Sequence, residues 1–327
     1  MLTAGMSARR RPDIEPSARA FWRRTVLAPL AVLSAFTSTA CFGAPPERAE
    51  PSPESSPSAI LEVFDVGGSG WEMSATDDHL WVQVGPPVDA VVRVEKATGE
   101  VTATIPGGST VEADSEGLWV GCCDGVARID PVSGEELLRA PGEGALALGE
   151  GFAWLYSQDG RLTKVHATTG AVEQAATIDP ALCTDSKDLL IAFGYAWLAC
   201  RHGVVVRMDL TAGTSSVLPT AGGTHTFAAT GEDVWVTNED ANSVMRIDPD
   251  TADVVEIRGV GTGVGITVGD GYVWASDENG IAKIDPETNE VVDHIDLGTD
   301  QLFELVWDDG VIWATTTTDR VLEVDAR

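Results

Sequence analysis

The stretch GITVGDGYVWASDENGIAKIDPETNEVVDHIDLG, residues 265–298, contains four short apolar runs separated by turn residues. Each run is too short for a helix and is rich in Val and Ile. The interruptions carry Gly, Asp, Asn and Pro, which are the residues that end strands and form turns. The stretch therefore predicts four β-strands that form one antiparallel meander.

A Trp in the second strand of this unit recurs along the chain. The seven residues are Trp81, Trp119, Trp154, Trp197, Trp235, Trp274 and Trp313. Successive Trp residues lie 38, 35, 43, 38, 39 and 39 positions apart. A period of about 40 residues with four strands per period is typical of a β-propeller. Asp-Pro turns such as DPDTAD and DPETNE follow the third strands, as hairpins require. The sequence thus predicts seven blades.

The two ends of the repeated region complement each other. The seventh unit stops after its third strand, and residues 59–66 (AILEVFDV) form a lone strand-like run before the first unit. Pairing this run with the last unit supplies the missing strand and removes a free edge. We therefore expect an all-β fold over residues 59–327, a seven-bladed propeller of four-stranded antiparallel blades closed by the N-terminal strand. The repeated Trp residues are expected to pack one blade against the next.

The first 41 residues are expected to be an export signal. Basic residues precede the apolar run TVLAPLAVLSAF (residues 25–36), which has the length of a signal-peptide core. The run leads through small residues to Cys41, an arrangement that resembles the lipobox of bacterial lipoproteins, in which the cysteine is lipidated. Ser38 stands where that box usually has an aliphatic residue, so simple secretion is the alternative.

Residues 42–58 consist mainly of Pro, Ser and Glu and predict an extended, solvated linker. With lipid on Cys41, this linker would hold the propeller off the extracytoplasmic face of the cell membrane. The whole chain has 51 acidic and 21 basic residues, a net charge of −30. This charge argues against binding to nucleic acid, and against membrane contact other than through the lipid.

Four cysteines follow Cys41, and an even number outside the cytoplasm suggests disulfides. Cys183 precedes the first strand of the fourth unit and Cys200 ends its second strand. These two points meet at one end of a meander blade, so a Cys183–Cys200 disulfide is expected. Cys122 and Cys123 would form a vicinal disulfide or stay reduced, and no His lies at ligand spacing to favour zinc.

The first strand of each propeller blade lines the central channel. The loop that enters this strand lies ten residues before each Trp, at Trp71, Ser109, Gly144, Lys187, His225, Val264 and Phe303. Among these, Trp71, Lys187, His225 and Phe303 are candidate ligand-binding residues, because pockets combine apolar walls with a few polar groups. The alternative is a set of ordinary loop residues around a water-filled channel.

Acidic turns follow the second strands of the fifth and sixth units. Their carboxylates, Glu239, Asp240, Asp277 and Glu278, are candidate ligands for Ca²⁺ or Mg²⁺. Solvated surface is the alternative in so acidic a chain, and by default we expect no cofactor. The sequence has no Ser-His-Asp order, phosphate loop or metal-binding His pair, so it shows no nucleophile with an evident base.

Residues 234–255 (VWVTNEDANSVMRIDPDTADVV) and 273–292 (VWASDENGIAKIDPETNEVV) resemble YVTN-type and NHL-like propeller repeats of bacterial surface proteins. They look especially like the streptogramin lyase (virginiamycin B lyase) relatives and the sensor propellers of some bacterial Ser/Thr kinases. The resemblance implies a lyase that opens a cyclic depsipeptide with a His base and carboxylate-held Mg²⁺. His225 in GGTHTF lies in a comparable loop, but Val264 stands where that family's pattern leads us to expect a second His.

Two functions follow from these observations. The first is a lipid-anchored, extracytoplasmic, monomeric module that binds or senses a protein, a peptide or a cell-envelope molecule without catalysis. The alternative is a metal-assisted lyase or hydrolase, with His225 as base and carboxylates of the fifth or sixth unit on the cation.

Overall fold

The computed structural model describes residues 59–114, 117–122, 125–261, 263–298 and 301–327. The expected export signal, the lipidated Cys41 and the linker lie outside these residues. The described residues belong to one compact unit and contain 28 strands and no helix. Accordingly, no helix in this part of the chain has the length and apolarity needed to cross a membrane.

The strands form seven antiparallel sheets of four strands, each sheet being one blade. Blades one to three contain β2 (Gly70–Ala75), β3 (His79–Val84), β4 (Ala90–Glu95), β5 (Val101–Pro106), β6 (Gly108–Asp114), β7 (Gly117–Cys122), β8 (Gly125–Ile129), β9 (Glu136–Ala140), β10 (Ala145–Gly149), β11 (Phe152–Tyr156), β12 (Arg161–His166) and β13 (Val172–Thr177). Blades four to six contain β14 (Ser186–Ala192), β15 (Tyr195–Cys200), β16 (Val204–Asp209), β17 (Ser215–Pro219), β18 (Thr224–Ala229), β19 (Val234–Asn238), β20 (Ser243–Ile247), β21 (Val254–Arg258), β22 (Ile266–Gly269), β23 (Tyr272–Ser276), β24 (Gly280–Asp285) and β25 (Glu290–Asp296). Blade seven contains β26 (Leu302–Asp308), β27 (Val311–Thr316), β28 (Arg320–Asp325) and β1 (Ile60–Asp65).

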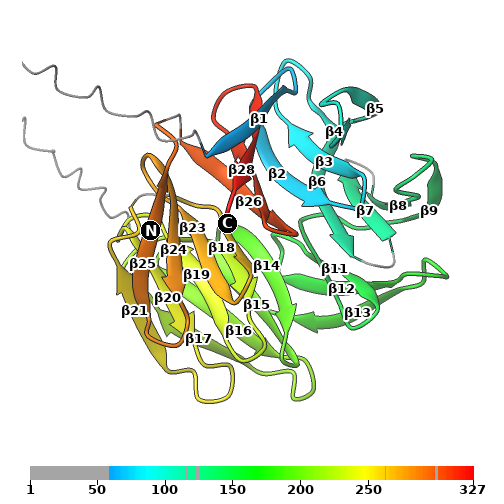
Figure 1. Ribbon diagram of the computed structural model, residues 1–327. Coiled ribbons are helices and arrows are strands. Elements are labelled where there is room, and N and C mark those ends of the chain that lie inside the picture. The colour runs from blue at the N-terminus through cyan, green and yellow to red at the C-terminus, as the bar shows by residue number, and fades with distance from the viewer. Residues whose placement is uncertain (1–58, 115–116, 123–124, 262, 299–300) are drawn as a thin grey trace, which may run out of the picture. The chain divides into compact units, whose positions relative to one another are not determined.

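The predicted seven-bladed propeller is therefore confirmed. The blades follow one another around a ring, and strands such as β2, β6, β14 and β26 lie toward its centre (Figure 1). Outer strands such as β13, β17 and β21 lie at its edge (Figure 1).

The N-terminal strand closes the ring as expected. β1 pairs antiparallel with β28, so the last sheet has the order β1-β28-β27-β26. Phe64 of β1 is 7% exposed, and its ring centroid lies 5.6 Å from that of Trp313. The strand therefore contributes buried apolar area as well as backbone hydrogen bonds to blade seven.

The repeated Trp residues form the core between blades, as predicted. Each of the seven is at most 3% exposed. The Trp197 indole N–H donates to the Ala192 carbonyl oxygen at 3.2 Å, and Trp154 and Trp274 make the equivalent bond. In these three residues the large ring gains apolar contact while its one polar atom keeps a partner. The buried Nε1 atoms of Trp81 and Trp235 have no hydrogen-bond partner among the described residues.

Basic side chains on third strands tie consecutive blades together. The Arg246 guanidinium lies 5.6 Å from the Trp235 ring centroid and donates to the Pro286 carbonyl oxygen of blade six at 2.7 Å. Arg93 and Arg207 likewise lie over the Trp of their own blade and donate to a carbonyl oxygen of the next blade. A cation–π contact and a charge-assisted hydrogen bond therefore reinforce the apolar packing between blades.

The sulfur atoms of Cys183 and Cys200 are joined in a disulfide, with the Cα atoms 5.5 Å apart. The disulfide joins the segment before β14 to the end of β15. Cys183 lies four residues before Lys187, which lines the central cavity. Cys122 ends β7 and is half-buried, whereas Cys123 lies outside the described residues.

Candidate functional site

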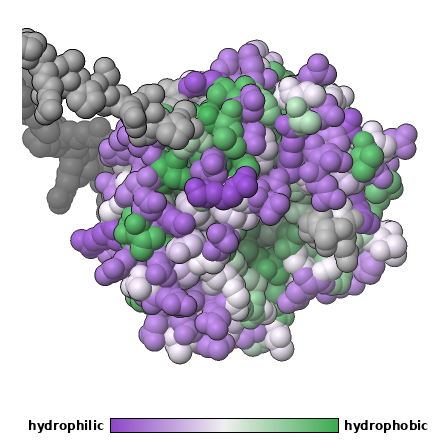
Figure 2. Space-filling model, in the orientation of Figure 1, coloured by the Kyte–Doolittle hydropathy of each residue, from purple (hydrophilic) through white to green (hydrophobic). Residues whose placement is uncertain are grey.

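A cavity of about 780 Å³ lies among the first strands of the blades. The surface of the face in Figure 2 is mostly hydrophilic and is hollowed near the middle of the ring, where hydrophobic side chains gather. All seven positions that the Trp spacing selected line the cavity, namely Trp71, Ser109, Gly144, Lys187, His225, Val264 and Phe303. The Trp spacing therefore selected residues that line one cavity, and their ligand-binding role stays a prediction.

Bulges in the first strands increase the number of side chains that reach this cavity. In β2 the register shifts between Gly70 and Met73, and both intervening residues, Trp71 and Glu72, line the cavity. Shifts in β14 and β26 bring in two further pairs, Lys187 with Asp188 and Phe303 with Glu304. A bulge opposes two residues to one on the neighbouring strand and thereby re-aims side chains.

Trp71 and Phe303 form an aromatic wall of the cavity. Their rings are stacked, with centroids 5.1 Å apart and planes inclined by 26°. Trp71 is nonetheless 50% exposed. Gly85 leaves room for it, since a Cβ at that position would lie 2.9 Å from the Trp71 Nε1 atom. The wall thus presents a broad aromatic face to whatever enters the cavity.

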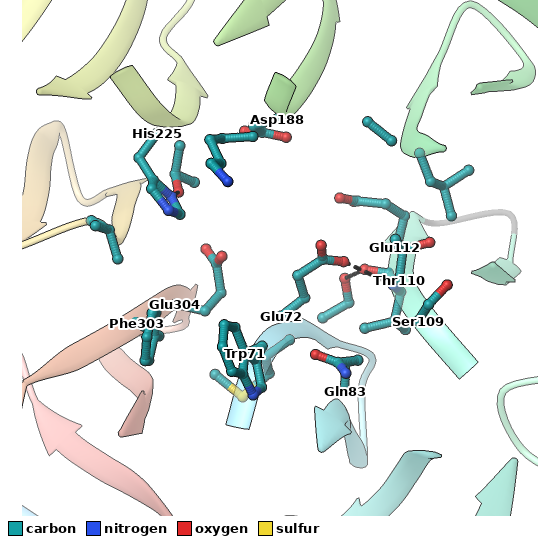
Figure 3. A pocket seen from close by; sticks show the side chains of 18 of the residues that line it. Trp71, Glu72, Gln83, Ser109, Thr110, Glu112, Asp188, His225, Phe303 and Glu304 are labelled. Carbon is teal, nitrogen blue, oxygen red and sulfur yellow. Dashed lines mark hydrogen bonds between the residues drawn. The ribbon is translucent and has the colours of Figure 1, made fainter. Parts of the chain in front are cut away.

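Acidic side chains share the cavity with this wall, and the sequence analysis missed them. Glu72, Asp188 and Glu304 extend toward the same open space from β2, β14 and β26 (Figure 3), and Glu112 of β6 also lines it. The first three lie nine residues before their blade's Trp, one position after the loop residues selected above. The same spacing would have found them, but strand alternation predicts that neighbouring residues point to opposite sides.

Burial is the main influence on these carboxyl groups. It raises the pKa of Glu72 from 4.5 to about 8, with the charge of Asp188 acting in the same direction. Burial also raises the pKa of Asp188 to about 6. The pKa of Glu304 is raised well above its usual value by burial and then by the charges of Asp188, Glu72 and Glu112. The side chains keep some contact with the cavity, yet protein surrounds the carboxyl groups closely enough to disfavour their ionised forms.

Two of the acids also have a structural role. The inner edge of each first strand has no neighbouring strand within its blade, so its N–H groups need other acceptors. Glu72 Oε2 accepts the Val111 N–H at 3.2 Å, and Asp188 Oδ2 accepts the Phe227 N–H at 2.8 Å, each across a blade boundary. Within the described residues, Glu304 has no such bond to another blade, and its Oε1 accepts only the adjacent Leu305 N–H at 3.3 Å.

The two nitrogen-bearing candidates differ in charge. Lys187 Nζ lies 3.1 Å from Asp185 Oδ1, so its charge has a local partner. Burial, followed by the charges of Lys187 and Arg201, lowers the pKa of His225 to about 4. At neutral pH the imidazole is therefore uncharged and available as a base or a hydrogen-bond acceptor.

The candidate metal ligands lie elsewhere. Asp277 and Glu278 line a separate hollow, where Asp277 Oδ2 lies 2.9 Å from His294 Nδ1. Asp240 Oδ2 accepts the Gly223 N–H at 2.9 Å. Across the described ranges, no three His, Cys, Asp or Glu side chains are placed to hold a metal ion together.

The candidate carboxylates of blades five and six do not line the cavity that contains His225, and their binding of a metal ion stays a prediction. The turns that carry them connect second to third strands and lie one strand outward from the channel. The acids in the cavity of His225 come instead from blades one, two, four and seven.

Comparison with known families assigns more than half of the chain to one family. Residues 142–326, more than half of the chain, match the family described as a domain of unknown function (DUF5074). The chain belongs to the DUF5074 family. In this DUF5074 protein the match runs from blade three to blade seven and includes His225 and Glu304, whereas Trp71 and Glu72 lie before it. No curated protein matches the chain in sequence.

Solved structures similar to this DUF5074 protein include virginiamycin B lyase from Staphylococcus aureus, in its selenomethionine-substituted form. The TM-score is 0.65 at 12% identity, with 81% of this chain and 98% of the lyase covered. The computationally designed Ika8 protein gives a TM-score of 0.59 at 12% identity, with 80% of this chain and 98% of that chain covered. The expected likeness to the streptogramin lyase propellers is therefore confirmed for the fold, and a fold alone does not specify an activity.

Proposed function

We propose that this DUF5074 protein is a non-catalytic binding or sensing module whose ligand enters the central cavity. The observation that carries the proposal is the aromatic wall, in which Trp71 is half exposed while the seven repeated Trp residues are at most 3% exposed. A large apolar ring left open to a cavity of about 780 Å³ gains free energy when a ligand covers it. The polar groups around it would orient a small molecule, or a peptide or cell-envelope group that reaches the channel.

The same proposal places the protein outside the cytoplasm, anchored to the membrane by lipid on Cys41. The Cys183–Cys200 disulfide supports this location, because disulfides form and persist in oxidising compartments. Cell fractionation tests it: the wild type should sediment with membranes and Cys41→Ser should be soluble. A Cys41→Ser variant that still sediments with membranes would refute the lipid anchor.

A thermal-shift screen tests the binding function. Ca²⁺, Mg²⁺, envelope glycans, peptides, amines and cyclic depsipeptides would be added to wild type, Trp71→Ala and Phe193→Ala. A ligand selective for the folded state raises the melting temperature. Phe193 is the matched control, because it is an exposed aromatic residue at the other end of β14 from Lys187.

We expect a ligand that stabilises wild type and Phe193→Ala but not Trp71→Ala. A shift that survives in Trp71→Ala would place the ligand outside the aromatic wall. A panel that stabilises none of the three proteins would refute a small-ligand cavity and turn attention to protein partners on the rim.

A lyase or hydrolase is the second candidate, and the neutral imidazole of His225 in the cavity favours it. The low pKa of His225 keeps the ring unprotonated at pH 7, as a general base requires. Incubation with cyclic depsipeptides, followed by mass spectrometry, would detect ring opening. Opening by wild type that is lost in His225→Ala would establish the enzyme, and intact substrate with wild type would exclude this reaction.

A further inference from the structure

We propose that the cavity binds a small organic cation, an amine or a guanidine, between the face of Trp71 and the carboxylates of Glu72, Asp188 and Glu304. This inference rests on the proposed binding function and names the class of its ligand. Four properties of the cavity support it.

The first property is a cluster of acidic groups that have no basic partner at ion-pair distance among the described residues. Within the described residues, no Lys or Arg lies at ion-pair distance from Glu72, Asp188 or Glu304. The lysine of the cavity, Lys187, is paired with Asp185, and His225 is uncharged at neutral pH. Carboxylates in a low-dielectric cavity gain strongly from an opposite charge at ion-pair distance, and none of the described basic side chains lies that close to these three acids.

The second property is the position of Glu304. Glu72 and Asp188 accept N–H groups of neighbouring blades, so packing alone accounts for part of their presence. Among the described residues, Glu304 accepts only the N–H of the next residue, and it follows directly after Phe303 of the aromatic wall. Burying a carboxyl group without a partner destabilises the fold, which an uncharged side chain would avoid. A ligand that pairs with Glu304 would explain why a carboxyl group is buried at this position.

The third property is the size of the space and its aromatic side. A cavity of about 780 Å³ has the volume of sites that enclose small organic molecules. The acids do not form a metal-binding group among the described residues. Trp71 and Phe303 offer a stacked π surface beside the acids, and the face of Trp is the preferred partner of an organic cation.

The fourth property links the ligand to protons. The pKa of Glu304 is raised by burial and by the charges of Asp188, Glu72 and Glu112, so its ionised form is disfavoured when the cavity is empty. A cation beside it favours the ionised form and lowers that pKa. Binding should therefore release protons, and it should strengthen as the pH rises.

Titration calorimetry with putrescine tests the proposal. Both amines of putrescine are protonated at pH 7, and butanediol is an uncharged ligand of the same length. The full-length chain would be used at about 150 mM salt, which screens attraction to the acidic surface. Repeating the titration in buffers of different ionisation enthalpy counts the protons released. The variants are Glu304→Gln and Glu290→Gln, which make the same substitution, Glu290 being exposed on the outer strand β25.

We expect one putrescine per chain, proton release, no binding of butanediol, and binding weakened about tenfold or more by Glu304→Gln alone. Equal effects of the two variants, several weak equivalents per chain, or no heat from putrescine would overturn the inference. If putrescine does not bind while a neutral ligand stabilises wild type but not Trp71→Ala, the proposed cationic ligand class is refuted and the binding function stands. If neither binds, both proposals fail.

Discussion

Glu72 provides the sharpest prediction about stability, because its carboxyl group is buried next to another acid. Its pKa rises from 4.5 to about 8 on folding, so the folded state holds more protons than the unfolded state between these values. The free energy of unfolding must therefore fall as the pH rises from 4.5 to 8. Glu72→Gln removes the titration, while its amide oxygen can still accept the Val111 N–H. We expect the variant to gain stability at pH 8 and to match wild type near pH 5.

The size of the effect follows from the same pKa. The change from 4.5 to about 8 corresponds to about 5 kcal/mol, at about 1.4 kcal/mol for each pH unit. The side chain is half-buried, and solvent in the cavity screens part of its charge, so we expect about 2 kcal/mol. In a domain of this size that is a rise of about 5 °C in Tm at pH 8.

Urea unfolding, followed by the fluorescence of the buried Trp residues at several values between pH 5 and pH 8, measures this difference. The matched control is Glu290→Gln, which makes the same substitution on the exposed outer strand. It should unfold like wild type at every pH. A free energy of unfolding of wild type that does not change over this range would refute the raised pKa of Glu72. A Glu72→Gln protein less stable than wild type at pH 8 would refute it as well.

Other predictions concern the contacts that hold the ring together. Cys200→Ser should lower the free energy of unfolding by about 3 kcal/mol and make urea unfolding insensitive to reductant; equal stability with and without reductant in wild type would contradict this. Arg246→Met should cost about 2 kcal/mol through loss of the Trp235 and Pro286 contacts, and a change no larger than in exposed Arg258→Met would refute the blade-joining role. Phe64→Ala should lower the free energy of unfolding by about 3 kcal/mol, because it leaves a cavity beside the Trp313 ring. A loss below 1 kcal/mol would mean that β1 closes the ring by backbone pairing alone.

The fold could be predicted because its information is local and repeated. Each strand is marked by its own apolar run and turn residues, and the Trp spacing sets the blade period. The closure by β1 followed from a simple count, since the last unit lacked a strand and the first had one too many. None of these steps required knowledge of contacts between blades.

The site could be predicted only in part. The Trp spacing found residues that line the cavity, including Trp71 and Phe303, but not the acids one residue further on. Most of these residues lie within the first strands rather than in the expected loops before them. The residues that follow these loops turn toward the cavity through bulges, and a bulge depends on pairing with the next strand rather than on sequence alternation. Acidity likewise marked the turns of blades five and six as candidate metal ligands, but whether such turns line the channel depends on where their strands lie in the blade. Metal binding by these carboxylates stays a prediction.

Carboxyl footprinting tests the central claim, that the ligand binds in the axial cavity, most directly. The protein would be treated with a carbodiimide and an amine nucleophile, with and without the ligand that stabilises it in the thermal screen, and modified residues would be identified by mass spectrometry. The account predicts that ligand lowers modification of Glu72 and Glu304 and leaves Glu239 and Glu290 unchanged. Protection confined to Glu239 or other rim carboxylates, with Glu72 and Glu304 modified as before, would contradict it.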